Sequence, residues 1–223
     1  MRHLYFIVLF ISMQVFSQDP ITKTLGEFSK LKVFDLINIE LIKSDENKII
    51  ISGENRSDVS VIQKNNTLKI RMKLKKMFNG KNTKIKLYYT SVDEIDANEG
   101  AEVSVKSKIK QYEIILKAQE GARITAAVDT KQLTVKSITG GVVTTTGETT
   151  KQNITVRTGG VYEGSNITAQ NSSLFIKAGG EAYVKTTNVL EVKIFSGGDV
   201  FVYGTPKQLK QNKLFGGRLI FKD

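Results

Sequence analysis

Cysteine and tryptophan are absent from this chain of 223 residues, and histidine occurs once, as His3. Without cysteine there is no disulfide, no thiolate metal site and no bacterial lipid anchor on cysteine. Without a histidine beyond the N-terminus, Ser-His-Asp and Cys-His nucleophile systems and a histidine-liganded zinc site are excluded. The sequence therefore predicts no catalytic residues of these classes, no bound metal and no cofactor.

Long apolar runs are also scarce. The one at residues 4–11 follows Arg2 and His3, and small residues then precede a cleavage position ahead of Gln18. This order is typical of a secretory signal peptide, which we place at residues 1–17; a retained anchor is the alternative. No later segment approaches the roughly 20 apolar residues of a membrane-spanning helix. We expect an exported protein, in the periplasm, on the outer surface or secreted, without a transmembrane segment in the mature chain.

Only two prolines occur, Pro20 and Pro206, and no change in composition suggests a linker. The mature chain is long enough for one domain with a substantial core. We divide it into N-terminal β coils and a cap at residues 18–92, continuous with regular coils at residues 93–223.

Glycine-centred steps recur through the second half of the chain. They are Glu99-Gly100-Ala101, Glu120-Gly121-Ala122, Thr139-Gly140-Gly141, Thr158-Gly159-Gly160, Ala178-Gly179-Gly180, Ser196-Gly197-Gly198 and Phe215-Gly216-Gly217. Their middle glycines are 21, 19, 19, 20, 18 and 19 residues apart. A near-constant period of this length indicates a solenoid of stacked structural units.

Apolar residues flank each glycine with a spacing of two, which is typical of strands with one buried face. Leu174 and Ile176 precede one corner, for example, and Val200 and Val202 follow the next. We therefore predict an all-β fold, a single-stranded right-handed parallel β-helix of about 20 residues per coil, with two strands of four or five residues in each. A sandwich of hairpins is the alternative, but hairpin turns do not return one motif at one interval.

Residues 25–92 are β-rich without the glycine period. Leu68, Ile70 and Met72 alternate with Lys69 and Arg71, so this strand has one apolar and one basic face. We expect irregular first coils here that cap the N-terminal end of the solenoid.

The basic residues of this region form the first candidate binding surface, namely Lys69, Arg71, Lys73, Lys75 and Lys76. Such a cluster attracts anions such as lipopolysaccharide or acidic glycans. Export and the lack of interleaved aromatic residues argue against nucleic acid. The alternative is a solubilising face whose lysines protect an edge strand.

The second candidate surface is aromatic. Residues at equal repeat positions stack about 4.8 Å apart in such a fold. One predicted column is Ser104, Thr125, Thr144, Glu163, Tyr183, Phe201 and Ile220; another is Gln119, Ile138, Arg157, Lys177, Phe195 and Leu214. Both columns end in apolar residues, so Tyr183, Phe195 and Phe201 are candidate contacts for a partner. Alternatively, residues 208–223 fold over them as a cap.

The order of these features resembles one known family. A leader, phenylalanine-containing opening strands, the strand Thr67-Leu68-Lys69-Ile70, the step Asn98-Glu99-Gly100-Ala101 and the repeated glycine corners are similar to the putative autotransporter adhesin head domain, or GIN domain. The resemblance implies an exported β-helix of Gram-negative bacteria, with adhesion as the suggested role. It carries no site residues with it.

Three functions stay open at this point. We favour a non-enzymatic, adhesin-like protein that binds a surface glycan or a cell-surface protein. A polysaccharide-degrading enzyme would need paired carboxylates, and Asp96, Glu99 and Glu102 lie around one corner. A structural envelope protein would self-associate, end to end or side by side.

Overall fold

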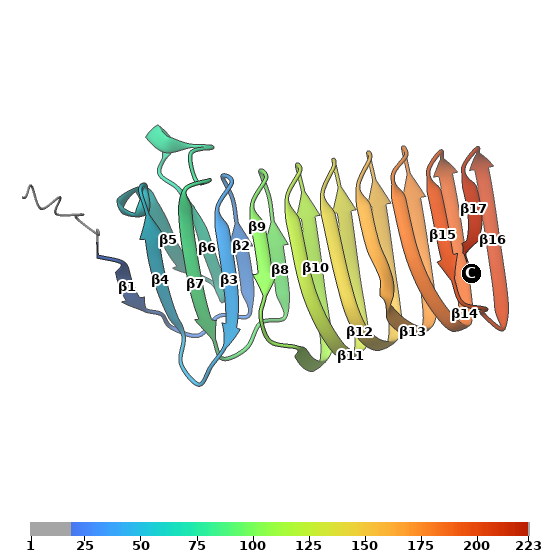
Figure 1. Cartoon of the computed structure of the whole chain (residues 1–223), viewed down its shortest axis with the longest axis horizontal. Coiled ribbons are helices and arrows are strands. Elements are labelled where there is room, and N and C mark those ends of the chain that lie inside the picture. Colours follow the sequence, from blue (N-terminus) through green and yellow to red (C-terminus); the bar gives the residue numbers. More distant parts are fainter. Residues whose placement is uncertain (1–18, 223) are drawn as a thin grey trace, which may run out of the picture.

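The glycine corners form the tight turns along one edge of an all-β solenoid (Figure 1). The computed structural model describes residues 19–222, which contain a β-solenoid of about 7 turns with about 19 residues per turn in its regular coils. The predicted all-β solenoid is confirmed, whereas its right-handed, single-stranded path stays a prediction. The predicted signal peptide lies outside the described residues. Within residues 19–222 no helix is long and apolar enough to cross a membrane.

Two groups of strands build the solenoid. The N-terminal group is β1 (Ile21–Thr24), β2 (Lys30–Val33), β3 (Asn38–Lys43), β4 (Lys48–Gly53), β5 (Val59–Lys64), β6 (Thr67–Met72) and β7 (Thr83–Tyr89), with the short 3-10 helices η1 (Arg56–Asp58) and η2 (Leu74–Lys76). The regular group is β8 (Glu94–Ala97), β9 (Glu102–Val105), β10 (Ile109–Gln119), β11 (Arg123–Ile138), β12 (Val142–Arg157), β13 (Val161–Lys177), β14 (Glu181–Ser196), β15 (Asp199–Tyr203), β16 (Gln208–Phe215) and β17 (Arg218–Lys222).

Strands β11 to β14 are longer than the sequence pattern predicted. Each is 16 or 17 residues long and runs from one glycine corner to the next, where two strands of four or five residues were expected. Ladder hydrogen bonds to the neighbouring coils continue through the bend, so the bend does not end the strand.

The bent strands give the solenoid two faces. Face A consists of β5, β6, β2, β8, the second halves of β10 to β14, and β16. Face B consists of β1, β4, β7, β3, β9, the first halves of β11 to β14, β15 and β17.

The parallel register confirms both predicted columns. Arg123 pairs with Val142 and Val142 with Val161, a shift of 19 residues each time. On face B, Thr144 pairs with Glu163, Glu163 with Tyr183, and Tyr183 with Phe201. On face A, Gln119 pairs with Ile138 and Ile138 with Arg157. The side chains between these columns point inward and form one continuous apolar core.

The first coils are not stacked in chain order. Strand β2 lies between β6 and β8, and β3 lies between β7 and β9, all in parallel. The described chain therefore begins at the N-terminal end with β1, which pairs antiparallel with β4, and then forms an inner coil with β2 and β3. It next moves outward to complete the N-terminal end and returns past β2 and β3. The outward excursion uses antiparallel pairs, β4 with β7 and β5 with β6. Figure 1 shows the resulting order β4, β7, β3, β9 along the solenoid.

Residues 208–222 do not fold over the aromatic columns. Strand β16 pairs in parallel with β14, and β17 pairs in parallel with β15, so this segment adds one more coil. Phe195 keeps 41% of its surface exposed. The capping alternative is therefore wrong for these residues, and the reason is that their backbone continues the existing ladders.

Candidate functional site

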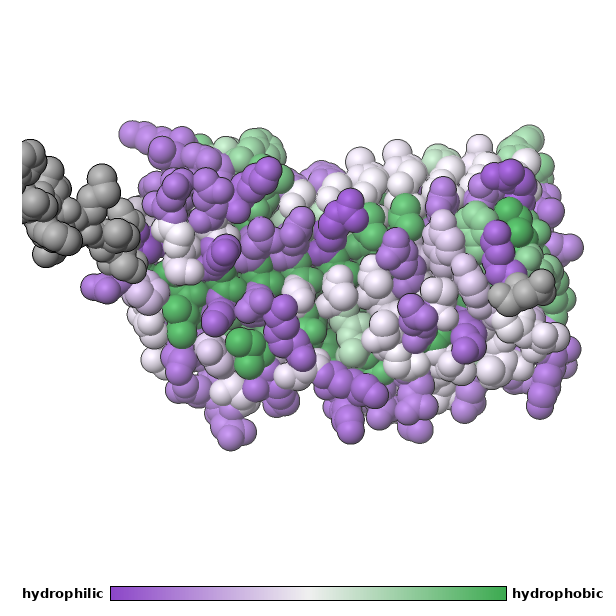
Figure 2. Space-filling view, in the orientation of Figure 1, coloured by the Kyte–Doolittle hydropathy of each residue, from purple (hydrophilic) through white to green (hydrophobic). Residues whose placement is uncertain are grey.

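A groove with a volume of about 680 Å³ lies on face B of the described surface. It crosses β4, β7, β3, β9 and β11 and runs along the solenoid axis. Figure 2 shows a hydrophobic band along this face between hydrophilic side chains. Eleven outward side chains contribute to its lining, namely Asn38, Glu40, Ile50, Ser52, Lys84, Lys86, Tyr88, Glu102, Ser104, Arg123 and Thr125.

Strand register arranges these side chains in two rows. The first row is Ser52, Lys84, Asn38, Glu102 and Arg123. The second row is Ile50, Lys86, Glu40, Ser104 and Thr125. Because residues two apart in a strand point to the same face, the rows run in parallel across all five strands.

The groove carries an excess of positive charge. Lys84, Lys86 and Arg123 face two carboxylates, and one of these, Glu40, already accepts an ion pair from Lys106 at 2.9 Å. The hydrogen bond from Lys106 lowers the pKa of Glu40, and the charges of Lys106, Lys86 and Lys84 lower it further. Glu40 is therefore held as an anion, and the remaining lysines face the groove.

The second row continues beyond the groove to the other end of face B. Thr125 is followed in register by Thr144, Glu163, Tyr183, Phe201 and Ile220. The rings of Tyr183 and Phe201 stack at 4.6 Å with an angle of 14° between their planes. A long ligand that follows the groove along the axis would reach these two rings.

Sequence reasoning missed most of this groove. It singled out neither Tyr88 nor Arg123, and it considered Glu102 only as a possible catalytic group. Pairing of β3 with both β7 and β9 brings the rows together, and this order differs from the order in the chain. The sequence signal that could have revealed the groove is opposite charge at paired outward positions, such as Lys86 beside Glu40.

The predicted basic residues lie on the other side of the solenoid. Lys69 and Arg71 point outward from β6 on face A, where their cations lie 4.8 and 5.9 Å from the centre of the Phe34 ring. Arg71 Nε is also 3.6 Å from the buried Asp35 carboxylate. Both side chains therefore have partners within the protein, which reduces their availability to a ligand.

Lys73, Lys75 and Lys76 follow β6 at the N-terminal end. Lys73 Nζ donates to the Ser57 carbonyl at 2.8 Å, whereas Lys75 and Lys76 are exposed in η2. The alternative that these lysines protect an edge strand is wrong for β6, which has β5 on one side and β2 on the other.

The three predicted aromatic residues are split between the two faces. Tyr183 and Phe201 lie on face B, while Phe195 lies on face A and packs edge-on against Phe215 at 5.8 Å. Lys177 Nζ lies 5.3 Å from the centre of the Phe195 ring. The eight predicted residues thus form three separate groups, and only Tyr183 and Phe201 share a row with the groove.

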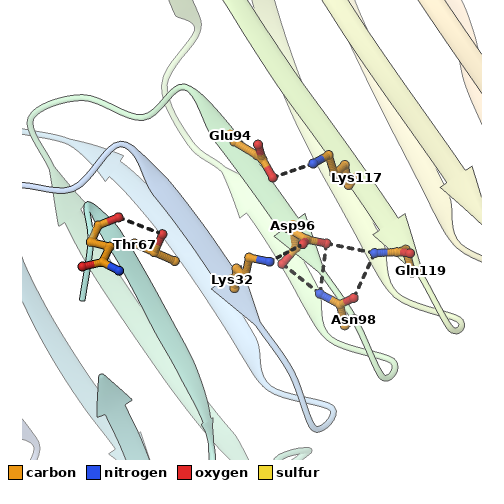
Figure 3. A network of polar contacts seen from close by, with 8 residues as sticks. Lys32, Thr67, Glu94, Asp96, Asn98, Lys117 and Gln119 are labelled. Atoms are coloured by element: carbon orange, nitrogen blue, oxygen red, sulfur yellow. Dashed lines mark hydrogen bonds and ion pairs between the residues drawn. The ribbon is translucent and has the colours of Figure 1, made fainter. Parts of the chain in front are cut away.

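The carboxylates of the predicted catalytic corner point in different directions. Asp96 lies on face A, Glu99 in the turn, and Glu102 on face B in the groove. Figure 3 shows that Asp96 is held by Lys32 at 3.4 Å and by the amides of Asn98 and Gln119 at 3.0 and 3.2 Å. The buried Asp96 carboxylate thus already has three side-chain partners and links β2, β8 and β10. It does not face a second acid across a substrate.

Glu99 has a partner of like charge. Asp35 is fully buried and accepts the backbone N–H groups of Met72 at 3.0 Å and Phe78 at 3.3 Å. Burial raises the pKa of Glu99, and the adjacent Asp35 carboxyl raises it further. This corner therefore takes up a proton more readily in the folded protein than in the unfolded chain.

Replacing Glu99 with glutamine should change the pH dependence of stability. The pKa of Glu99 is higher in the folded state than in the unfolded chain. The wild type therefore becomes more stable as the pH falls from that raised pKa to the ordinary value of 4.5. Glu99→Gln removes this proton uptake, so we expect it to be more stable than the wild type at pH 7.5, with a smaller advantage at pH 5. Urea unfolding at both values measures this.

Glu120 is the matched control for Glu99. It occupies the same position of the next corner, with φ of 54° against 52° for Glu99, but its side chain is exposed. Glu120→Gln should change the difference in stability between pH 7.5 and pH 5 much less than Glu99→Gln does, because the charge of Glu120 is the smallest of the causes that raise the pKa of Glu99. An equal response of both variants would contradict the assignment to the Asp35–Glu99 pair.

Within residues 19–222 no group of three or more histidine, cysteine, aspartate or glutamate side chains is placed to hold a metal ion. The polar side chains of the groove are instead amide, hydroxyl, ammonium, guanidinium and carboxylate groups. Such groups make hydrogen bonds and ion pairs with an extended polar ligand.

Comparison with solved structures places the fold beside a set of bacterial proteins. A putative adhesin from Bacteroides fragilis NCTC 9343 is 20% identical, with a TM-score of 0.83 over 92% of this chain and 98% of the other. A putative adhesin from Parabacteroides merdae ATCC 43184 is 15% identical, with a TM-score of 0.70 over 92% and 97%. A putative lipid binding protein from Parabacteroides distasonis ATCC 8503 is 16% identical, with a TM-score of 0.66 over 92% and 97%. At these identities the likeness shows the fold alone.

No curated protein matches the chain. The profile of one family, described as "Putative auto-transporter adhesin, head GIN domain", matches residues 27–206. The match covers the strands from β2 to β15, including those that form the groove. Since it spans most of the sequence, this chain belongs to the auto-transporter adhesin head GIN domain family.

Proposed function

We propose that the protein is an exported, non-enzymatic adhesin-like module that binds a linear acidic glycan along face B. Membership of an adhesin family supports the general role, and the groove supports the ligand class. The observation that carries the proposal is a groove along the axis, with a partly apolar floor and two rows of mostly polar side chains in which cations exceed carboxylates (Figure 2). A straight groove of this kind fits an extended chain better than a compact small molecule.

The row that continues to Tyr183 and Phe201 extends the proposed site. The Tyr183–Phe201 pair lies in register with the groove, and because the two rings stack on each other it offers ring edges to the C–H groups of a sugar. A ligand long enough to reach from Lys86 to Phe201 would use both ends of the face. The repeated 4.8 Å rise between coils provides evenly spaced contacts for a repeating polymer.

The environment of Glu40 supports a binding role for the groove over a glycosidase role. A general acid requires a carboxyl whose pKa is raised, whereas the pKa of Glu40 is lowered by Lys106 and the neighbouring lysines. Glu102 and Glu40 also lie on adjacent strands of one sheet face, so they do not face each other across a bond.

Charge reversal in the groove tests the proposal. We expect Lys84→Glu/Lys86→Glu to weaken binding of a linear polyuronate by about ten-fold or more, because two attractive contacts become repulsive. The matched control is Lys75→Glu/Lys76→Glu, which makes the same change in net charge at the η2 surface and should change affinity less than about three-fold. Biolayer interferometry at low and high salt measures both, with neutral dextran as the control ligand.

Two outcomes would contradict this placement. Equal losses in both variants would mean that net charge alone drives binding. Loss only in the η2 variant would move the site to the basic residues that follow β6.

Tyr183→Ala/Phe201→Ala should weaken the binding of a long polyuronate but leave the binding of a short oligomer unaffected. An equal effect on the binding of both lengths would confine the ligand to one part of the face.

A further inference from the structure

The last described coil is basic throughout. Residues 204–222 contain five cationic side chains and no aspartate or glutamate. These are Lys207, Lys210, Lys213, Arg218 and Lys222. Only Arg218 is held in a salt bridge within the described residues, with its Nε 2.8 Å from Asp199 Oδ1.

The same coil exposes large apolar side chains. The exposed fractions are 39% for Leu209, 59% for Leu214, 64% for Phe215 and 55% for Phe221. Figure 2 shows hydrophobic residues among hydrophilic ones at this end of the molecule. We call this set of exposed lysines and apolar residues of β16 and β17 the C-terminal tip.

Strand register shows that the inward positions of the tip do not repeat the apolar residues of the preceding coil. Gln211 and Lys213 stand opposite the buried Val192 and Ile194, so polar side chains occupy two inward positions. Phe221 stands opposite the buried Val202 but is itself largely exposed. The last coil, formed by β16 and β17, thus exposes both ammonium groups and apolar side chains.

We propose that the C-terminal tip docks on a lipid bilayer that contains anionic headgroups. Phe215, Phe221 and Leu214 are suited to insert at the boundary between headgroups and acyl chains, while Lys207 and Lys213 face the anionic headgroups. The inference depends only on the composition and exposure of the tip and is independent of the glycan proposal. Docking in this way leaves the groove on face B open to solvent.

A second copy of the chain is a poorer occupant of the tip. Within the described residues, β16 pairs only with β14 and β17 only with β15, so each has one open edge. Two identical tips would bring together two sets of four lysines that have no salt bridge within the described residues. Lysines on an edge strand oppose pairing of this kind.

Vesicle sedimentation tests the charge requirement. We expect the mature protein to bind vesicles of phosphatidylcholine with 30% phosphatidylglycerol at low salt, and not vesicles of phosphatidylcholine alone. Lys207→Glu/Lys213→Glu should lower the partition coefficient at least about 20-fold, at roughly five-fold for each lysine lost. Lys75→Glu/Lys76→Glu makes the same net-charge change at the opposite end and should bind as the wild type does.

A tryptophan at the tip tests insertion, because the natural chain has none. Phe215→Trp should show a blue-shifted emission on anionic vesicles and quenching by brominated acyl chains. Tyr112→Trp, at a site 66% exposed on β10 far from the tip in the sequence, should show neither change. Circular dichroism before each assay confirms that the variants are folded.

Several results would overturn the proposal. These are absence of binding to anionic vesicles, equal losses in the two charge variants, or unchanged Phe215→Trp emission on vesicles that bind the protein. A concentration-dependent dimer in sedimentation velocity that Phe215→Trp disrupts would assign the tip to self-association instead. Loss of glycan binding in the groove variants would leave vesicle binding unaffected, so the two proposals fail separately.

Discussion

Gly160→Ala is expected to destabilise the protein far more than Gly159→Ala, although the two residues are adjacent in one corner. A Cβ at Gly160 would lie 2.1 Å from the Ser137 carbonyl oxygen of the preceding coil. That oxygen belongs to the backbone of a packed strand, so it cannot move aside without shifting the coil. We expect a loss of about 3 kcal/mol, near the upper end for overpacking.

Gly159 has a different reason for being glycine. Its φ is 71°, and no atom lies within 4 Å of a Cβ placed there. Alanine at this position bears only the cost of a left-handed conformation, about 1 kcal/mol. Thermal unfolding should therefore show a decrease in Tm of roughly 6–12 °C for Gly160→Ala and roughly 2–4 °C for Gly159→Ala. Equal decreases would contradict the assignment of contact between coils to Gly160.

Tyr162→Phe should destabilise the middle of the solenoid, where a buried chain of hydrogen bonds crosses the core. Tyr162 Oη lies 2.8 Å from Thr145 Oγ1 and donates to Gln152 Oε1 at 2.9 Å. Gln152 Nε2 donates to Ser172 Oγ at 2.8 Å. Loss of the phenol leaves buried polar groups without a partner, which costs about 2 kcal/mol, or roughly 4–8 °C in Tm.

Tyr183→Phe is the matched control for Tyr162→Phe. Its hydroxyl donates to Glu181 at 2.7 Å on the partly exposed outer side of face B, where water can replace the lost bond. This change should cost less than about 0.5 kcal/mol. If the two variants unfold at the same temperature, the core network does not contribute as proposed. Burial also raises the pKa of Tyr162, so ionisation of this phenol should accompany unfolding at alkaline pH.

The regular coils were largely predictable because their determinants are local. A glycine step at a fixed period and apolar residues spaced by two set the columns, and Tyr183 pairs with Phe201 as expected. The same rule, applied to the corner at Gly159, places Tyr162 at an inward position. It could not show that Gly164 leaves room for the Tyr162 ring, since a Cβ there would lie 2.5 Å from the ring.

The candidate site was less predictable because it depends on which strands are neighbours. Lys84 and Lys86 were not among the predicted binding residues, and their position close to Glu40 requires β7 to lie beside β3. The basic residues of β6 and β7 are divided between the two faces for a related reason. Alternate residues on β6 point to face A, and the lysines on β7 point to face B, so one run of basic sequence serves two surfaces.

The sequence by itself determined the all-β class, the period of the coil and the identity of the residues that stack in each column. These follow from backbone preferences and from the alternation of side chains along a strand, both of which act within a few residues. Only the tertiary structure decided the groove, the separation of Asp96 from Glu102 and the exposure of the C-terminal tip. Insertion of the first coil between later ones joins strands that are distant in the chain, and the free energy of that pairing depends on the whole core rather than on any local pattern.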